Sequence, residues 1–208
     1  MPKNTLNKII IKKEQKLQEL KKTISIEALK EIIEENSTFL NFKEKIENNI
    51  DSNKISLIAE IKKASPSAGI ILQAYNPVDI AKKYHENKAT CLSVLTEEDF
   101  FQGNLMHLHK IKQKINLPIL CKDFFIDPFQ VHLAKSYGAD AILIILAGVT
   151  EKMANQLYED ALKLIKVLFS LIFSFNDSIE VIFFSSFNFC SFFFIILFRV
   201  FSTILNRS

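Results

Sequence analysis

Two oppositely charged side chains stand at the end of the first long apolar run of this 208-residue chain. Glu60 closes the run at 55–60 (ISLIAE), and Lys62 follows two positions later. Side chains two residues apart on a strand point to the same side. A lysine beside the glutamate would favour the ionised carboxylate and suit a site for an anionic substrate. The same spacing also fits a solvated salt bridge, because most charged pairs lie at the surface.

Further polar groups follow the next apolar runs. Residues 96–99 (TEED) come after 90–95 (TCLSVL), and Lys122 and Asp123 come after 117–121 (LPILC). If these runs are parallel strands, their carboxyl ends share the edge where a (β/α)8 barrel collects its active-site groups. No Gly-x-Gly-x-x-Gly follows the first run, which argues against a Rossmann site. The polar residues therefore favour a barrel over an open doubly wound sheet.

Strand and helix patterns alternate from residue 51 to residue 164, which predicts a parallel sheet with right-handed crossovers. Asn76-Pro77 and Asp127-Pro128 each combine a capping residue with a proline, the signal for a helix start. Gly138 fits the end of the helix that follows Pro128. The predicted strands are 55–60, 90–95, 117–121 and 141–147, and the predicted helices follow Asn76 and Asp127 and span 105–115 and 150–164.

The first fifty residues are rich in Lys and Glu, with apolar residues at helical spacing. They predict amphipathic helices around a turn near 23–25, packed on one end of a barrel with a solvated charged face. A net charge of +3 without a basic, aromatic-rich stripe argues against a nucleic-acid partner. Three cysteines, of which Cys91 and Cys121 lie in apolar runs, suit a reduced cytoplasmic protein. The N-terminus has no apolar signal core, so export is not expected.

The residues 57–71 (LIAEIKKASPSAGII) resemble the signature of indole-3-glycerol phosphate synthase. The resemblance continues through NPVDIAKKYHENKATCLSVLTEEDFFQG, PILCKDFFIDPFQV and YGADAILIILAGVT, and covers roughly residues 5–164. It implies an α/β fold of the TIM (β/α)8-barrel family, truncated here to about four βα units. The expected organisation is an N-terminal helical extension (1–50), a partial barrel (51–164) and a hydrophobic, Phe-rich tail (165–208) that does not continue the family.

The resemblance also implies roles for the charged residues. Lys122 matches the general acid of the family, Lys62 matches the lysine that contacts the substrate carboxylate, and Glu60 matches a glutamate that arranges the catalytic groups. The family closes the indole ring of 1-(2-carboxyphenylamino)-1-deoxyribulose 5-phosphate in tryptophan biosynthesis. The products are indole-3-glycerol phosphate, carbon dioxide and water, so this carboxy-lyase needs an acid for the oxygen that leaves.

The remaining matches concern binding of the phosphorylated small-molecule substrate. Ser65 matches a serine that helps to hold the phosphate, and it also fits an ordinary Ser-Pro turn. Phe101, Phe124 and Leu143 match positions that line the pocket against the substrate's aromatic ring, where simple core packing is the alternative. The family needs no metal or organic cofactor, and the histidines of this chain do not form a metal-binding pattern: His85, His107, His109 and His132.

Composition changes sharply after Leu164. Most of the 19 phenylalanines lie beyond it, whereas all 4 glycines and all 5 prolines precede it. The family continues with a fifth strand that bears a catalytic glutamate, and then with asparagine and serine motifs, none of which matches here. Three interpretations compete: a frameshift extension, which we favour, a membrane anchor at 181–198, or strands of a divergent barrel. The expected function is an impaired synthase; the alternatives are an inactive remnant and a membrane-tethered, non-enzymatic protein.

Overall fold

The central sheet is parallel and follows the order of the chain. The computed structural model describes residues 3–35, 39–172 and 181–184. The strands of the sheet are β1 (Ile58–Ile61), β4 (Cys91–Leu95), β5 (Ile119–Lys122), β6 (Ala141–Ile145), β7 (Lys166–Ile172) and β8 (Val181–Phe184). Their order is β1-β4-β5-β6-β7-β8, with parallel pairing up to β7 and antiparallel pairing of β8. A doubly wound sheet reverses its strand order at a switch point, and this sheet does not.

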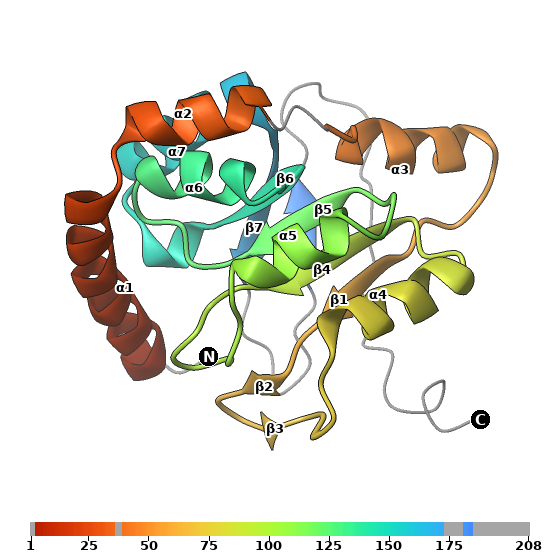
Figure 1. Cartoon of the computed structure of the whole chain (residues 1–208), viewed down its shortest axis with the longest axis horizontal. Helices are drawn as coiled ribbons and strands as arrows, with labels where there is room; N and C mark the ends of the chain where they lie inside the picture. Colours follow the sequence, from red (N-terminus) through yellow and green to blue (C-terminus); the bar gives the residue numbers. More distant parts are fainter. Residues whose placement is uncertain (1–2, 36–38, 173–180, 185–208) are drawn as a thin grey trace.

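Four helices connect the five parallel strands, which confirms the four predicted βα units (Figure 1). They are α4 (Pro77–Glu86), α5 (Met106–Lys112), α6 (Phe129–Ser136) and α7 (Glu151–Leu164). The starting signal Asn76-Pro77 is used, because the Asn76 side chain accepts hydrogen bonds from the backbone at the start of α4, and Thr150 does the same for α7. At Asp127-Pro128 the helix starts one residue later than predicted: Pro128 lies at the cap position, and Asp127 accepts a hydrogen bond from the backbone N–H of Phe129. Gly138 takes a positive φ of 94° just after α6, where glycine adopts this conformation without strain.

The observed elements are shorter than the predicted ones at their ends. β1 begins three residues later than expected, because the ladder with β4 starts at Ile58 and leaves Ile55 almost fully exposed. The strand predicted at 141–147 ends at Ile145, where a short 3-10 turn, η1 (Leu146–Gly148), leads into the loop before α7. Apolar periodicity cannot set these ends, since backbone pairing determines where a strand stops.

Alternate side chains of β1, β4, β5 and β6 enter two different apolar clusters. One face, with residues such as Ala59, Leu92 and Ile142, packs under α4 to α7. The other face, with residues such as Ile58 and Leu143, packs against side chains of the N-terminal helices. The two-residue period of a strand explains the division. Both predicted buried cysteines are confirmed as buried free thiols, and they lie on opposite faces: Cys91 and Cys121.

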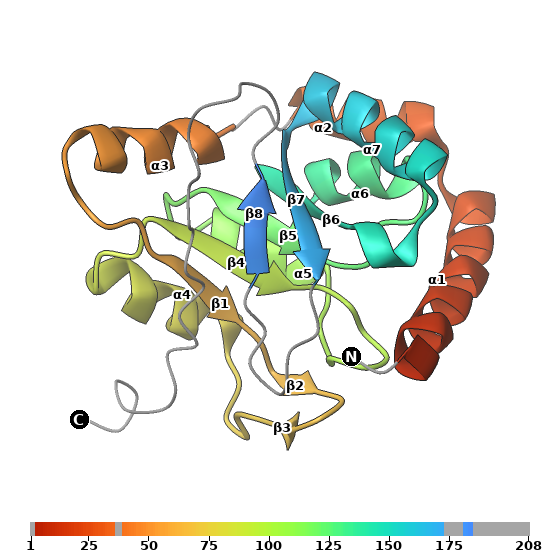
Figure 2. The same cartoon turned by 180° about the vertical axis from the view of Figure 1, so that it is seen from behind.

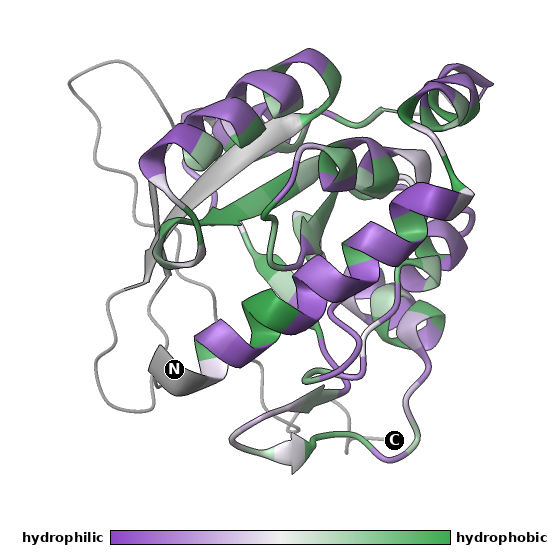
Figure 3. Cartoon of the chain, turned by 90° about the vertical axis from the view of Figure 1, so that its left-hand side faces the viewer, coloured by the Kyte–Doolittle hydropathy of each residue, from purple (hydrophilic) through white to green (hydrophobic). Residues whose placement is uncertain are grey.

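Three N-terminal helices surround the sheet: α1 (Lys3–Thr23), α2 (Ile26–Glu35) and α3 (Phe42–Asp51). The turn predicted near 23–25 is confirmed. α1 lies along one side of the molecule (Figure 1) and shows many hydrophilic residues on its outer face (Figure 3). It is joined to loops that follow β4 and β5, whereas α3 meets the amino end of β4 through a hydrogen bond from Asn49 to Thr90. The extension therefore covers both ends of the sheet, not one end as expected.

The parallel sheet continues past the boundary expected at residue 164. β7 pairs with β6 over five residues, and β8 follows at the edge of the sheet (Figure 2). An apolar segment placed beside a parallel strand can extend the sheet through backbone hydrogen bonds alone. Residues 173–180 and 185–208 lie outside the described residues, and so does most of the segment considered as a membrane anchor. Within the described part of the chain, no helix combines the length and apolar character needed to cross a membrane.

Candidate active site

Glu60, Lys62 and Lys122 meet at the carboxyl edge of the sheet. The Lys62 ammonium lies 2.5 Å from one carboxylate oxygen of Glu60, and the Lys122 ammonium donates to the other oxygen. Glu60 belongs to β1 and Lys122 ends β5, so the pair reaches across β4, which lies between them. The three residues that sequence reasoning selected as catalytic thus form one cluster, although they come from positions as far as 62 residues apart.

The cluster is partly buried and carries one more positive than negative charge. The side chains of Glu60, Lys62 and Lys122 are 14%, 18% and 23% exposed. Burial alone would raise the pKa of the Glu60 carboxyl, but the ammonium groups of Lys122 and Lys62 outweigh burial and lower the pKa to about 2. Glu60 is therefore ionised at neutral pH. The excess cation at this edge suits a negatively charged ligand.

We expect Glu60 to titrate near pH 2 in the folded protein, against an ordinary value of 4.5. Because the folded-state pKa is lowered, Glu60 contributes stability above its unfolded pKa, and this contribution is lost as the pH falls from about 4.5 toward 2. Carboxyl-carbon NMR of the labelled protein measures the midpoint directly. In the Lys122→Met variant the midpoint should rise. A Glu60 midpoint of 4.5 in the wild-type protein would contradict the ion-pair geometry.

The three residues predicted to line the pocket against the aromatic ring of the substrate belong to one apolar group. The rings of Phe101 and Phe124 are tilted with centroids 6.2 Å apart. Phe124 and Leu143 are buried, and Phe101 is partly buried against the same group. The three residues therefore line a common surface on the face of the sheet that also carries Ile58. Their role as the pocket wall for the aromatic ring of the substrate stays a prediction.

Ser65 lies in the hairpin formed by β2 (Ala64–Ser65) and β3 (Gly69–Ile70), which follows β1. Its buried hydroxyl accepts a hydrogen bond of 3.2 Å from the backbone N–H of Ala68. Gly69 takes a positive φ of 62°, which permits the tight return of the chain. The backbone N–H of Ala64 donates to the carbonyl of Phe101, so the hairpin is joined to the pocket residues. The turn interpretation of Ser65 agrees with these bonds, and its phosphate role stays a prediction.

Glu97 was not selected from the sequence, yet it shapes the loop that carries Phe101. Its buried carboxylate accepts hydrogen bonds from the backbone N–H groups of Asp99, Phe100 and Phe101. Gly103 closes the same loop: a Cβ there would lie 2.5 Å from the carbonyl oxygen of residue 95. The available signal was the position of the TEED segment directly after a buried strand. Charge alone did not reveal that one of these carboxylates turns inward.

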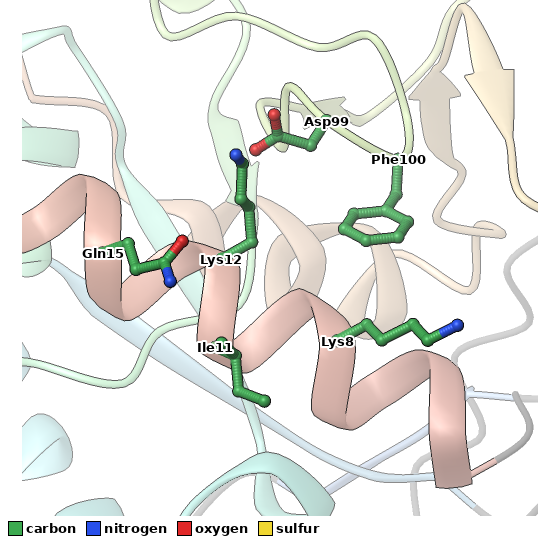
Figure 4. Close-up of a pocket in the computed structure, with 6 residues that line it drawn as sticks. All are labelled: Lys8, Ile11, Lys12, Gln15, Asp99 and Phe100. Atoms are coloured by element: carbon green, nitrogen blue, oxygen red, sulfur yellow. The ribbon is translucent and has the colours of Figure 1, made fainter.

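Two further observations concern the described residues outside this cluster. In the part of the chain that the structure describes, no group of three or more His, Cys, Asp or Glu side chains could hold a metal ion. A shallow groove of about 250 Å³ lies between α1 and the loop after β4 (Figure 4). None of the residues selected from the sequence lines it. Its lining consists of Lys8, Ile11, Lys12, Gln15, Asp99 and Phe100.

These observations define a class of protein: an α/β protein whose strands follow one another in the sheet and which gathers a lysine-rich, anion-compatible site at their carboxyl edge. Comparison with known proteins is more specific. The family model described as indole-3-glycerol phosphate synthase matches residues 6–169. The chain belongs to the indole-3-glycerol phosphate synthase family.

Curated relatives carry the same name. The synthase of Trichodesmium erythraeum is 42% identical over 151 residues, which are 73% of this chain and 50% of that protein. The synthase of Alkaliphilus metalliredigens is 43% identical over 147 residues, 71% of this chain and 55% of that protein. The synthase of Aliarcobacter butzleri is 50% identical over 107 residues, 51% of this chain and 41% of that protein. The chain thus spans about half the length of these relatives.

Proposed function

We propose that this chain acts in the indole-3-glycerol phosphate synthase reaction of tryptophan biosynthesis and supplies the part of the site that binds the substrate carboxylate and donates a proton. We further propose that its sheet is the first part of a (β/α)8 barrel. Family membership and the uninterrupted strand order support this architecture. The observation that carries the proposal is the placement of Lys62 and Lys122 on one carboxylate at the carboxyl edge of the sheet.

The proposed division of work follows from that placement. Lys62 binds the carboxylate of 1-(2-carboxyphenylamino)-1-deoxyribulose 5-phosphate. The aromatic carbon of the substrate then attacks the ketose carbonyl, where negative charge develops on oxygen. Lys122 donates a proton to this oxygen, which becomes a hydroxyl group, and the carboxylate leaves as carbon dioxide so that its bonding electrons restore the aromatic ring. The hydroxyl group then leaves as water with a second proton, while the adjacent carbon of the new ring releases a proton to form the indole double bond, so these two protons balance. Glu60 stays ionised and holds both ammonium groups in position, as its lowered pKa of about 2 allows.

Binding of the rest of the substrate is assigned to neighbouring residues. Phe101, Phe124 and Leu143 form the apolar surface for the aromatic ring, and their shared cluster supports this assignment. Ser65 contributes to holding the phosphate at the hairpin after β1. We propose a cytoplasmic setting, which the two buried free thiols suit. No metal, organic cofactor or nucleic acid is part of the proposal.

Two assays test the proposed activity. Expression of the full chain should restore growth of a tryptophan auxotroph that lacks the synthase, and the double variant Lys62→Met/Lys122→Met should not. Because the chain contains no tryptophan, the protein itself gives no indole fluorescence. In an in vitro assay, the indole fluorescence that appears on addition of substrate therefore reports the product. The matched control is Lys163→Met, which removes a lysine of an exposed ion pair on α7. Absence of growth and of product with the wild-type chain would favour the inactive remnant instead, and equal activity of the wild-type chain and the double variant would contradict the roles of the two lysines.

A further inference from the structure

Lysines of α1 reach the two loops that carry the candidate site. Lys16 pairs with Glu98 and Asp99 in the loop after β4, and Lys21 lies 2.5 Å from Asp127 in the loop after β5. Lys13 lies 2.7 Å from Asp123, the residue next to Lys122. Positions three and eight residues apart lie near one face of a helix. One face of α1 is therefore joined electrostatically to both loops.

The pair of Lys13 and Asp123 differs from the other contacts in its burial. The two side chains are 12% and 9% exposed, whereas those of Lys16 and Glu98 are 38% and 49% exposed. Exposed ion pairs contribute little, because water and salt screen the charges. A buried carboxylate that loses its cation is left uncompensated in a low-dielectric surrounding. Among these ion pairs of α1, the one with Lys13 is therefore the one whose loss should have the largest local effect.

Asp123 is the junction through which this pair acts. One of its oxygens accepts a 2.8 Å hydrogen bond from the Thr96 hydroxyl, and the other accepts a 2.7 Å bond from the backbone N–H of Phe124. The backbone N–H of Thr96 in turn donates to the carbonyl of Lys122. The carboxylate thus joins α1, the end of β4 and the end of β5 at the residue that directly follows Lys122, the proposed acid.

α1 does not need Lys13 in order to pack on the sheet. Ile9 and Leu17 are buried in two separate apolar clusters, and Ile10 packs close to Gly148. Removal of one charge leaves these contacts unchanged. The ion pair between Lys13 and Asp123 consequently fixes the position of residues 122–124 more than it attaches α1 to the sheet.

We propose that Lys13 is a positioning residue of the active site, which acts through Asp123 to hold the end of β5 so that Lys122 and Phe124 keep their places. The catalytic meaning of this assignment rests on the proposed function. The structural part of the assignment does not rest on it, because it concerns how firmly the loops after β4 and β5 are held in the protein without substrate.

Amide hydrogen exchange of the full chain tests the positional claim. Lys13→Met keeps a side chain of similar reach and removes the charge. We expect amides at 96–101 and 123–128 to exchange faster by roughly tenfold or more, while amides elsewhere in β4 and β5 keep their rates. Lys13→Arg should restore the wild-type rates. Lys8→Met, which alters an exposed lysine of the same helix, should leave them unchanged. Faster exchange throughout the sheet would instead show a general structural role and overturn the proposal.

A second variant approaches Asp123 from its other side. Thr96→Val removes the hydroxyl that donates to the same carboxylate and should also accelerate exchange at 123–128, so it decides the case if Lys13→Met does not fold. Unchanged exchange in the variants that fold, or equal acceleration in Lys8→Met, would overturn the assignment. With substrate, Lys13→Met should lower kcat through Lys122 and raise KM through Phe124, and Lys13→Arg should restore both constants. If the wild-type chain shows no turnover, the proposed function fails, and the exchange rates still decide the role of Lys13.

Discussion

Replacement of Asp140 with alanine is expected to lower the free energy of unfolding by about 3–5 kcal/mol. The Asp140 carboxylate is fully buried and lies 2.5 Å from the Lys112 ammonium, whose side chain is only 11% exposed. It also accepts hydrogen bonds of 2.9 Å from the backbone N–H groups of Leu40 and Ile119. Alanine leaves one buried cation and two backbone donors without this acceptor, and each of these losses destabilises the folded state.

Urea unfolding followed by circular dichroism measures this loss. The control is Asp160→Ala, which breaks an exposed ion pair with Lys163 on α7 and should change the free energy of unfolding by no more than about 0.5 kcal/mol. A similar small change in Asp140→Ala would show that the buried cluster does not stabilise the fold. Lys112→Met provides a second test, because it should also destabilise the protein by leaving the buried carboxylate without its cation.

The charged residues at the two ends of the sheet therefore differ in role. Asp140 joins the start of β5 to the segment before α3 and to the end of α5, all at the amino end of the strands. Glu60 and Lys122 lie at the carboxyl end, where parallel α/β folds place their chemistry. Buried charge at the first end stabilises the connections between elements. Partly exposed charge at the second end stays accessible to a ligand. Mutations at the two ends should consequently separate stability from activity.

Much of the fold and the meeting of the charged residues in the candidate site could be predicted from local sequence. Capping residues such as Asn76 and Thr150 mark helix starts because their side chains satisfy free backbone N–H groups within a few residues. The meeting of Glu60 with Lys122 was predictable as well, since parallel neighbouring strands bring their carboxyl ends to one edge. These inferences require only periodicity, caps and the direction of the strands.

The position of α1 could not be predicted in the same way. An amphipathic pattern shows that a helix has an apolar face, but not which end of a sheet this face covers. Lys13 and Asp123 are 110 positions apart, and nothing near either residue identifies its partner. The inward orientation of the Glu97 side chain could not be predicted either. Its hydrogen bonds to backbone N–H groups of the loop depend on how the loop folds, which the pattern of charges does not specify. Side chains whose partners lie far away in the sequence, such as Lys13, are thus harder to find than the charged residues that follow directly on a strand.

β7 lies in the tail, for which we favoured a frameshift extension and kept strands of a divergent barrel as an alternative. The abrupt rise in phenylalanine content after Leu164 suggested that the sheet ended there. Pairing in a sheet depends on the backbone, so a segment with altered composition can still add a strand beside β6. The family match also continues to residue 169, a few positions into this strand. Composition therefore shows where residue usage changes but not where the sheet ends, because β7 continues the sheet beyond this point.

Lys122→Met and Lys62→Met are expected to damage the proposed reaction in different ways. Lys122→Met should lower kcat by roughly 10²–10⁴-fold with little change in KM, because the proposed acid acts only as the oxygen leaves. Lys62→Met should instead raise KM by roughly 10-fold to 100-fold, because the charged contact with the substrate carboxylate exists already in the bound ground state. Indole fluorescence at several substrate concentrations measures both constants.

The two variants control for each other. Each removes one ammonium from Glu60 and leaves the other, so the loss of stability and the change in charge are closely matched. Any general disturbance of the site should affect both in the same way, whereas distinct chemical roles should separate kcat from KM. Equal changes of kcat and KM in both variants would contradict the division of work between the lysines. A clear separation would instead show that the Glu60 carboxylate holds two cations that serve two different steps, because both ammonium groups contact it.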